Sequence, residues 1–299
     1  MQQILSEYQH ENPCVRGNLY RIMNHGKLAG SSKLIILPVD QGMEHGPDAS
    51  FGSNPAAYDP LYHVKLAIDS GVNAYAAPLG MIEIAANKYP GVIPMILKIN
   101  SNNSLKSSDL EPQQAMISDV DDALRLGCVG VGITIYPGSH YSDEMLEQAQ
   151  FVFSKAKQSG LVCVVWSYPR GSGIYDETAF DTISYAAHIG AMTGAHIIKV
   201  KIPSAKVVNT KFLEVYDKLG VDLNALVSRI QHIKRCAFNG RRIILFSGGA
   251  HKNTQSILDE VRGIADGGGN GSIIGRNLFQ REYSEAIKLV DLMMQSYRT

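Results

Sequence analysis

Eight short and almost continuously apolar segments recur along the chain. They span residues 33–40, 72–78, 93–99, 128–136, 161–168, 195–202, 242–248 and 271–276. A strand with one face in water alternates apolar and polar residues, whereas a parallel strand that is covered on both faces is apolar throughout. We therefore interpret the eight segments as the strands of a buried parallel sheet.

The segments between these strands have the spacing of amphipathic helices. Residues 59–71 end at Gly71, which is suited to a helix C-cap. Strands and helices thus alternate along the chain. The other helical stretches are residues 142–160, which open with Ser142 as an N-cap candidate and end at Gly160, residues 176–194, 253–267 and 281–297, and a longer connection, residues 206–236, with two helical pieces.

Eight strands that alternate with helices predict an α/β protein with a single (β/α)8 TIM barrel. We assign residues 33–299 to this barrel, as one catalytic domain, and residues 1–32 to an N-terminal helical extension that packs on it. The alternative fold is an open doubly wound sheet, which carries a G-x-G-x-x-G turn after its first strand when it binds dinucleotides. Here the first strand continues into DQGMEHG, residues 40–46, which does not match that turn.

The charge balance of the chain argues against a polyanionic partner. Lysine plus arginine and aspartate plus glutamate both number 28, so the formal net charge is zero and nucleic acid is not an expected partner. No apolar run approaches the ~18 residues of a membrane helix. The first residues, MQQILSEYQHENPC, lack the regions of a secretory signal. We expect a cytoplasmic protein with no membrane partner.

The spacing of the cysteines bears on the redox compartment. Cys14, Cys128, Cys163 and Cys236 are far apart in the sequence and form no CxxC pair. Buried free thiols in a reducing compartment are the preferred interpretation, and a disulfide pair is the alternative.

In a (β/α)8 barrel the active site lies at the C-terminal ends of the strands. Taken alone, Asp40 could cap a turn, and Trp166 and Tyr168 could be core aromatics. Because all three lie at the same end of the barrel as the other polar residues, we favour one common site. The polar residues at these strand ends are Asp40, Glu44 and His45 after the first strand, Lys98 and Asn100 at the third, Trp166, Tyr168 and Arg170 at the fifth, Lys199 and Lys201 on the sixth, and Ser247 and Arg276 after the seventh and eighth.

The glycines after the seventh strand suit a phosphate cradle. Ser247, Gly248 and Gly249 offer a hydroxyl and backbone N–H donors, and Arg276 after the eighth strand offers a charged clamp. Barrels often bind phosphate with these two loops. A tight turn without a ligand is the alternative. The glycine-rich residues 266–271 precede the eighth strand, so we assign them to a turn on the opposite face.

Two lysines, Lys199 and Lys201, lie on one face of the sixth strand because they are two residues apart. A lysine at a strand end can be a snorkelling side chain or one half of an ion pair. An amine that is held in an apolar site beside another cation has a lowered pKa, and as a free base it attacks a carbonyl to form a Schiff base. Lys199 lies deeper in the apolar run and is the candidate nucleophile, with Lys201 as the neighbouring charge. The pattern alone leaves both interpretations open.

Eight motifs, in order and each at a strand end, resemble those of the archaeal-type class I fructose-bisphosphate aldolases, which also occur in bacteria. This resemblance implies a barrel that cleaves fructose 1,6-bisphosphate reversibly through a lysine Schiff base. It further implies a sugar-phosphate substrate, no metal or cofactor, and a ring-based homo-oligomer. The motifs, which run from about residue 33 to about residue 280, are PVDQGMEHGP, YAAPLGMIE, ILKINSNNSL, VGITIYPGSHY, WSYPRG, GAHIIKVKIP, FSGG and IGRN.

The resemblance also implies roles for individual residues. Lys199 corresponds to the lysine that forms the Schiff base, Tyr168 to the proton-transfer residue, and Asp40 to the residue that assists it. Trp166 corresponds to a tryptophan that lines the site. The residues that match the family's phosphate-binding motifs are Ser247, Gly248, Gly249, Gly275 and Arg276, with His45 and Arg170 expected at the other phosphate.

One residue departs from the family's pattern. His196 stands where many relatives have an aspartate, three residues before Lys199. We expect His196 to face away from the barrel interior, with little consequence for catalysis.

Three alternative functions remain open at this stage. The same lysine serves related transaldolase-like or acyl-transfer enzymes that act on other sugar phosphates. A metal-dependent enzyme would use His45, His140 and His251, although these histidines lack a short ligand spacing. A non-catalytic barrel would bind the sugar phosphate without needing Lys199 and Tyr168 together.

Overall fold

Eight parallel strands close into a barrel in the computed structural model, which describes residues 1–106, 109–248 and 252–298. The strand order is β1-β10-β9-β8-β7-β6-β3-β2, and the last strand pairs with the first, with Leu34 beside Gly271. The TIM-barrel prediction is therefore confirmed, and the open-sheet alternative is wrong. The strands, each inside one predicted segment, are β1 (Leu34–Pro38), β2 (Ala74–Ala77), β3 (Met95–Lys98), β6 (Gly130–Ile135), β7 (Val162–Ser167), β8 (Ile197–Lys201), β9 (Ile243–Ser247) and β10 (Gly271–Ile273).

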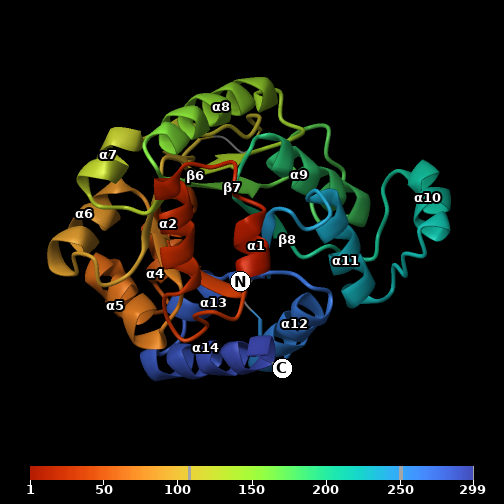
Figure 1. Ribbon diagram of the computed structural model, residues 1–299. Helices are drawn as coiled ribbons and strands as arrows, with labels where there is room; N and C mark the ends of the chain where they lie inside the picture. Colours follow the sequence, from red (N-terminus) through yellow and green to blue (C-terminus); the bar gives the residue numbers. More distant parts are fainter. Residues whose placement is uncertain (107–108, 249–251, 299) are drawn as a thin grey trace.

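Helices surround this barrel on its outside, as Figure 1 shows. Shorter helices, α3 (Gln41–Glu44), α4 (Pro47–Phe51), α10 (Leu213–Lys218) and α13 (Arg276–Phe279), with the 3-10 turns η1 (Pro55–Tyr58) and η2 (Thr210–Phe212), occupy the connections. The longer ones are α5 (Pro60–Ser70), α6 (Leu79–Lys88), α7 (Val120–Arg125), α8 (Ser142–Gln158), α9 (Phe180–Met192), α11 (Leu226–Cys236), α12 (Thr254–Asp266) and α14 (Tyr283–Arg298).

Local sequence explains where these helices begin and end. Asp59 accepts a hydrogen bond from the N–H of Leu61 at the start of α5, and Gly71 ends that helix with a φ of 73°, as predicted. In α8, Ser142 is the first helical residue and not the N-cap, which is Tyr141, so that detail of the prediction is wrong. A two-stranded antiparallel sheet, β4 (Asn100–Ser101) with β5 (Ala115–Met116), was not predicted because its strands are too short to leave a pattern.

The two faces of the barrel strands pack against different neighbours. Outward-facing side chains such as Ile198 and Val200 belong to the large core between the strands and the helices. Inward-facing side chains such as Ile197, Leu245 and Ile273 form a second core inside the barrel. Burial on both faces is the physical reason that the strand segments are apolar throughout.

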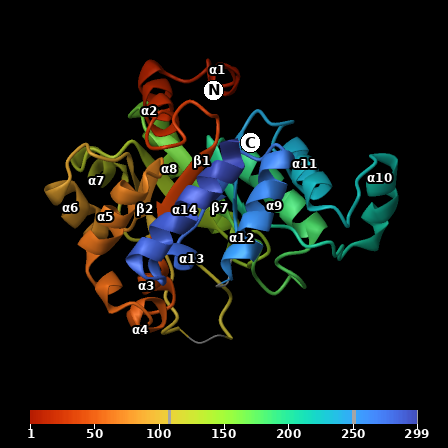
Figure 2. The same cartoon turned by 90° about the horizontal axis from the view of Figure 1, so that it is seen from below.

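The chain before β1 closes the N-terminal end of the barrel. Its helices are α1 (Gln2–Ser6) and α2 (Pro13–Met23), and Figure 2 places them at the opposite end of the molecule from α3 and α4. Tyr8, Leu19 and Ile22 are fully buried and belong to the core inside the barrel. The barrel is thus sealed at this end, and a ligand has access only to the other.

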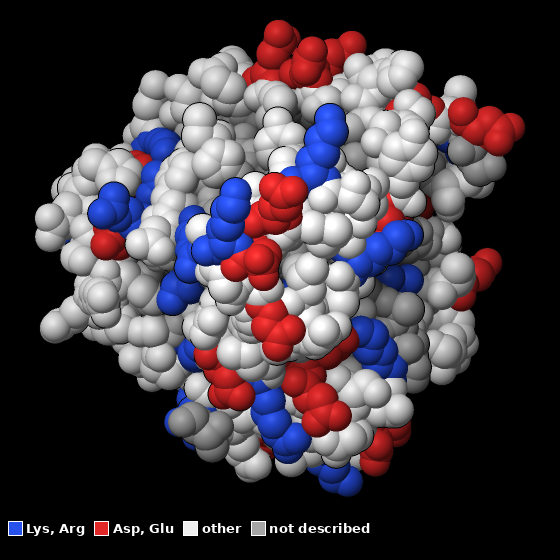
Figure 3. Space-filling view, turned by 90° about the vertical axis from the view of Figure 1, so that its right-hand side faces the viewer, with Lys and Arg blue, Asp and Glu red and all other residues white. Residues whose placement is uncertain are grey.

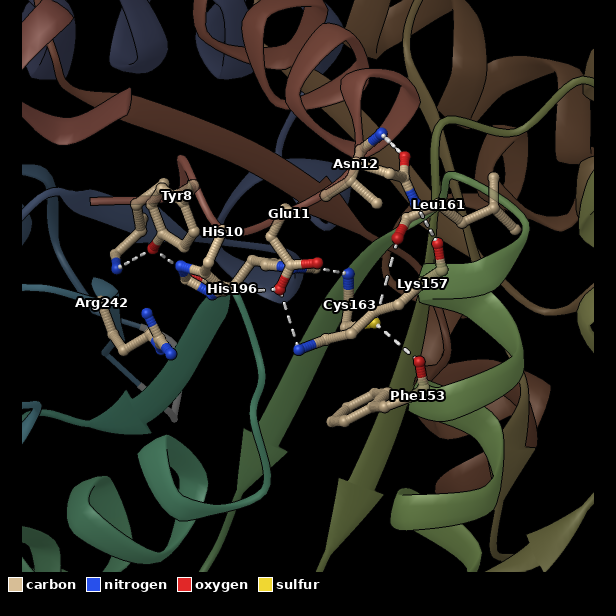
Figure 4. A network of polar contacts seen from close by, with 12 residues as sticks. Tyr8, His10, Glu11, Asn12, Phe153, Lys157, Leu161, Cys163, His196 and Arg242 are labelled. Atoms are coloured by element: carbon tan, nitrogen blue, oxygen red, sulfur yellow. Dashed lines mark hydrogen bonds and ion pairs between the residues drawn. The ribbon is translucent and has the colours of Figure 1, made fainter. Parts of the chain in front are cut away.

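Polar contacts fix this extension to the bottom of β8 (Figure 4). The hydroxyl of Tyr8 donates to the carbonyl of His196 at 2.7 Å and accepts from the N–H of Ile243 at 3.0 Å. The carboxylate of Glu11 lies 3.0 Å from His196 Nε2 and 3.0 Å from Lys157 Nζ. The extension is therefore held by buried hydrogen bonds as well as by apolar packing.

The environment of His196 determines its protonation state. The backbone N–H of Cys163 donates to His196 Nδ1 at 2.8 Å, so the ring proton is on Nε2, which faces Glu11. Burial lowers the pKa of His196, and this keeps the imidazole neutral. The residue that departs from the family's pattern thus anchors the N-terminal extension.

The remaining surface features bear on location and partners. On the face shown in Figure 3, basic and acidic side chains are interspersed, and no broad patch of one sign covers it. All four cysteines are free, and Cys128 and Cys163 are buried as predicted, whereas Cys14 is exposed. Across the described part of the chain, no helix combines the length and the apolar character that crossing a membrane requires.

The Glu11 contacts predict a loss of stability in E11Q. The variant removes the negative charge that faces Lys157, and a hydrogen bond to a charged group contributes about 1.5–3 kcal/mol to the free energy of unfolding. We expect a decrease of that size at pH 7, measured by urea unfolding, with earlier cleavage within residues 1–12 in limited proteolysis.

The pH dependence provides a further check. The hydrogen bond from His196 is the main reason that the pKa of Glu11 is lowered from 4.5 to about 2. A depressed carboxyl pKa gives stability that is present above the unfolded value and is lost as the pH falls towards 2. The gap between wild type and E11Q should therefore narrow between about pH 5 and pH 2. E147Q, at an exposed position of α8, is the control, and equal stability of wild type and E11Q at pH 7 would contradict the assignment.

Candidate active site

A polar cavity of about 190 Å³ lies at the C-terminal ends of β1, β7, β8, β9 and β10. The site residues predicted from the sequence line it together, apart from Trp166 and Gly249. Gly249 lies outside the described residues. The lining residues are Asp40, Gln41, Glu44, His45, Tyr168, Arg170, Lys199, Lys201, Ser247, Gly248, Ile273, Ile274, Gly275, Arg276 and Asn277.

Lys199 lies at the bottom of this cavity, on the inner face of β8. Its side chain is almost fully buried, with 5% of the residue surface exposed. Its Nζ lies 5.4 Å from the ring centroid of Tyr168 and 5.9 Å from that of Trp166. Trp166, which was expected to line the site, is buried in the neighbouring strand β7 and supports the amine without forming part of the cavity wall.

Burial lowers the pKa of the Lys199 amine to about 8. Asp40 and Glu44 oppose this shift by favouring the ammonium, and Arg276 and Arg170 add to it by repulsion. At pH 7 roughly a tenth of the molecules would carry the free amine, compared with less than ~0.1% for an ordinary lysine. The site therefore supplies a nucleophilic amine close to neutral pH.

Lys201 shares the inner face of β8 but has a different partner. Its ammonium forms an ion pair with Glu177, whose carboxylate also accepts from Arg170 Nε at 3.1 Å. The sequence assigned to Lys201 the positive charge that lowers the pKa of Lys199. The structure instead assigns this repulsion to Arg276 and Arg170, which come from other loops. Glu177, in the loop after β7, was missed because no sequence pattern marks it.

Tyr168 has a hydroxyl that is poised as a proton carrier. Burial, followed by the negative charges of Asp40 and Glu44, raises its pKa, so the phenol is protonated near neutral pH. Its hydroxyl shares a hydrogen bond with the side chain of Ser247. A protonated phenol can accept a proton from a ligand only if it gives its own proton to another group. The carboxylates that line the cavity are suitable acceptors.

Two carboxylates lie together at the start of α3. Asp40 is the N-cap residue, and its carbonyl accepts the N–H of Glu44 at 3.2 Å, so the two side chains are one helical turn apart. Burial and the repulsion from Asp40 raise the pKa of Glu44 to about 7. Glu44 was noted at this rim but was not predicted as a site residue. Its i, i+4 spacing from Asp40 is the signal that could have identified it.

Another part of the cavity lining consists of two glycines, Gly248 and Gly275, and the cation of Arg276. A Cβ on Gly275 would lie 2.7 Å from the carbonyl oxygen of Pro38, so only glycine fits there. A Cβ on Gly248 would lie 2.9 Å from a carboxylate oxygen of Glu260. Both glycines line the cavity together with Arg276, and backbone N–H groups beside a cation suit an anion.

His45 extends the same wall. Burial lowers the pKa of His45, and Arg276 and Arg170 lower it further, so the imidazole is neutral. The three-histidine metal hypothesis gains no support, because the described ranges 1–106, 109–248 and 252–298 hold no cluster of three His, Cys, Asp or Glu side chains suited to a metal ion, and His251 lies outside them.

Comparisons with known proteins agree with this geometry. Residues 34–281 match the model of the DeoC/LacD family aldolases. The chain is 35% identical over 308 aligned positions to the probable class 1 fructose-bisphosphate aldolase of Chlamydia muridarum, with 98% of this chain and 87% of the relative covered. It is 35% identical over 254 positions to the class 1 enzyme of Thermoproteus tenax, with 85% of this chain and 86% of the relative covered.

A solved structure of an archaeal fructose-1,6-bisphosphate aldolase is also similar. Its catalytic lysine is covalently bound to the carbinolamine intermediate of the substrate. It superposes with a TM-score of 0.78 at 31% identity, covering 95% of this chain and 100% of that one. The chain belongs to the DeoC/LacD family of aldolases and, within it, to the class I fructose-bisphosphate aldolases of the archaeal and chlamydial type.

Proposed function

We propose that this chain cleaves fructose 1,6-bisphosphate reversibly to dihydroxyacetone phosphate and glyceraldehyde 3-phosphate through a Schiff base on Lys199. The observation on which the proposal rests is the buried amine of Lys199, which has a pKa lowered to about 8 and lies in a cavity beside the ring of Tyr168. A scaffold or sensor has no use for such an amine, because a protonated surface lysine binds phosphate equally well.

In the first step the free amine of Lys199 attacks the C2 carbonyl of the open-chain sugar. The carbinolamine loses water and becomes an iminium. The iminium withdraws the electron pair of the C3–C4 bond as that bond breaks, which leaves an enamine on Lys199 and releases glyceraldehyde 3-phosphate. Protonation at C3 and hydrolysis then release dihydroxyacetone phosphate and restore the amine.

Cleavage requires that the C4 hydroxyl lose its proton. Tyr168 is proposed as the carrier, with Asp40 as the group that accepts the proton from it. The raised pKa of Tyr168 supports this division, because a tyrosinate is costly in this site and the phenol must therefore pass its own proton on. The same phenol, once it is protonated again, is suited to protonate the enamine.

The two phosphates are proposed to bind on opposite sides of the amine. One set of donors consists of Ser247, Gly248, Gly275 and Arg276. The resemblance of its motif adds Gly249 to this set. Arg170 and His45, with Lys201, provide the other set. Glu177 keeps Arg170 and Lys201 close together before the substrate arrives.

We further propose that the protein is a homo-oligomer located in the cytoplasm, with residues 33–299 as its one catalytic domain and residues 1–32 as an extension. In Figures 1 and 2, α10 stands away from the barrel, and it carries the exposed apolar side chains of Leu213 and Val215. Apolar side chains that project in this way suit burial against another subunit. Free buried thiols are typical of a reducing compartment. Sedimentation velocity measures the number of subunits.

The assignment of the nucleophile predicts different behaviour for the two lysines of β8. Borohydride reduction in the presence of dihydroxyacetone phosphate should link the substrate to Lys199, and K199M should lose both trapping and cleavage. K201M should still be trapped, with a pH profile close to that of the wild type, because Arg276 and Arg170 supply the repulsion at Lys199. Peptide mapping of the adduct decides the first point, and an adduct on Lys201 would overturn the assignment.

Y168F should form the covalent imine almost normally but turn over far more slowly. It removes only the hydroxyl, and a general acid or base contributes about 10²–10⁴-fold to the rate. Single-turnover trapping and steady-state cleavage separate the two steps, with Y185F on the exposed face of α9 as control. If Y168F turned over at the wild-type rate, the proton-transfer role would move to Asp40 or Glu44.

R276A tests the phosphate wall and the pKa of the amine in one variant. Loss of a charged hydrogen bond should weaken the binding of phosphorylated sugars by about 10- to 150-fold and leave unphosphorylated sugars nearly unaffected. Because Arg276 repels the ammonium of Lys199, the pH dependence of imine formation should also shift upwards from about pH 8. R262A, at an exposed position of α12, is the control. Equal losses for both kinds of sugar would instead assign Arg276 to the fold.

A further inference from the structure

A second buried lysine lies inside the barrel, and the mechanism above does not use it. Lys98 is the last residue of β3, and only 1% of its surface is exposed. Its Nζ lies 5.7 Å from the ring centroid of Trp166, the ring that also supports Lys199. The barrel interior thus holds two amines around one tryptophan.

The contacts of Lys98 identify it as an ammonium. Its Nζ donates to the backbone carbonyl of Asn100 and to Asn100 Oδ1 at 3.2 Å, and it lies 4.0 Å from Asp40 Oδ2. All three groups are acceptors, and an ammonium has three N–H donors, whereas a neutral amine would leave its lone pair facing acceptors. Burial lowers the pKa of Lys98, but the two hydrogen bonds to Asn100 and the nearby carboxylate of Asp40 all favour the ammonium.

Asn100 holds this ammonium in one place. Its Nδ2 donates to the carbonyl of Thr134 at 2.8 Å, and its Oδ1 accepts from the N–H of Thr134 at 2.7 Å. These two bonds continue the pairing of β3 with β6 beyond its last backbone register pair, Lys98 with Gly132. The position of the Lys98 ammonium is thus set by the barrel wall itself.

The charged groups that face Lys98 come from two elements. Asp40 and Glu44 attract it from the start of α3, and Lys199 repels it from β8. Asp40 is the nearest of them and is itself only 7% exposed. Replacing a whole buried ion pair with well-packed apolar residues is often neutral or stabilising, so stability alone does not account for a lysine paired with Asp40 at this position.

We propose that Lys98 is a positioning residue of the aldol reaction, whose ammonium pairs with the carboxylate of Asp40 and holds it in the cavity that it shares with the hydroxyl of Tyr168. Asp40 has Lys98 on the barrel side, and Glu44, Tyr168 and Lys199 on the cavity side. Without this ammonium the carboxylate would lose the partner that lies behind it, 4.0 Å away on the barrel side. The inference rests on the proposed function, in which Asp40 takes up the proton that Tyr168 passes on.

K98M is the first test. The variant removes the charge, keeps the side chain unbranched and only one atom shorter, and is expected to remain folded by circular dichroism. Trapping of dihydroxyacetone phosphate on Lys199 should persist, and KM for fructose 1,6-bisphosphate should change little. The value of kcat should fall about 10- to 100-fold, because the carboxylate of Asp40 is then no longer held in place for proton transfer. K88M, on the exposed side of α6, is the matched control.

A double-mutant cycle with D40N separates positioning from general support of the fold. If Lys98 acts through Asp40, K98M should cost little further activity in the D40N background. If the two losses multiply, or if K98M raises KM and leaves kcat unchanged, Lys98 does not act through Asp40 and the proposal is overturned. If K98M does not fold, K98Q, which keeps a donor without the charge, must show the same fall in kcat with little change in KM.

The outcome for wild type separates this inference from the proposed function. If wild-type protein is not trapped on Lys199, the Schiff-base function itself fails. If wild type is trapped and active while K98M and K98Q retain its kcat, only the role of Lys98 is rejected.

Discussion

The buried amine of Lys199 is the feature on which the rest of the site depends. It is almost fully buried inside a parallel barrel, and burial is the first cause of its lowered pKa. Carboxylates at the start of α3 oppose that shift, and two arginines from the loops after β7 and β10 add to it. The resulting balance leaves the amine protonated in most molecules, yet with a useful free fraction near neutral pH.

The barrel makes this balance possible because it is closed at one end and open at the other. The helices of the N-terminal extension fill the bottom of the interior with Tyr8, Leu19 and Ile22, and Glu11 fixes them to His196. His196 directly precedes β8 at the sealed end of the barrel, and the same strand carries Lys199 towards the open end. Packing at the bottom of the barrel and chemistry at the top therefore share one rigid element.

The fold could be predicted from the sequence because burial on both faces leaves a local pattern. Each observed strand lies inside a predicted apolar segment, and the closed barrel follows from their alternation with helices. Most site residues could be predicted for a related reason. In a barrel, position at a strand end is enough to place Asp40, Tyr168, Lys199 and Arg276 on one rim. The strands are recognised from residues that are neighbours in sequence. The site residues are recognised because each follows a strand in the alternating strand–helix pattern.

The sequence by itself therefore determined the architecture, the location of the site and the identity of the candidate nucleophile. Only the tertiary structure decided which charges act on that nucleophile. Lys201, two residues away in sequence, pairs with Glu177, whereas Arg170 and Arg276 approach Lys199 from other loops. Lys98 meets Asp40 across the barrel interior. Electrostatic contacts depend on distance in space, and no spacing along the chain records how two distant loops face each other.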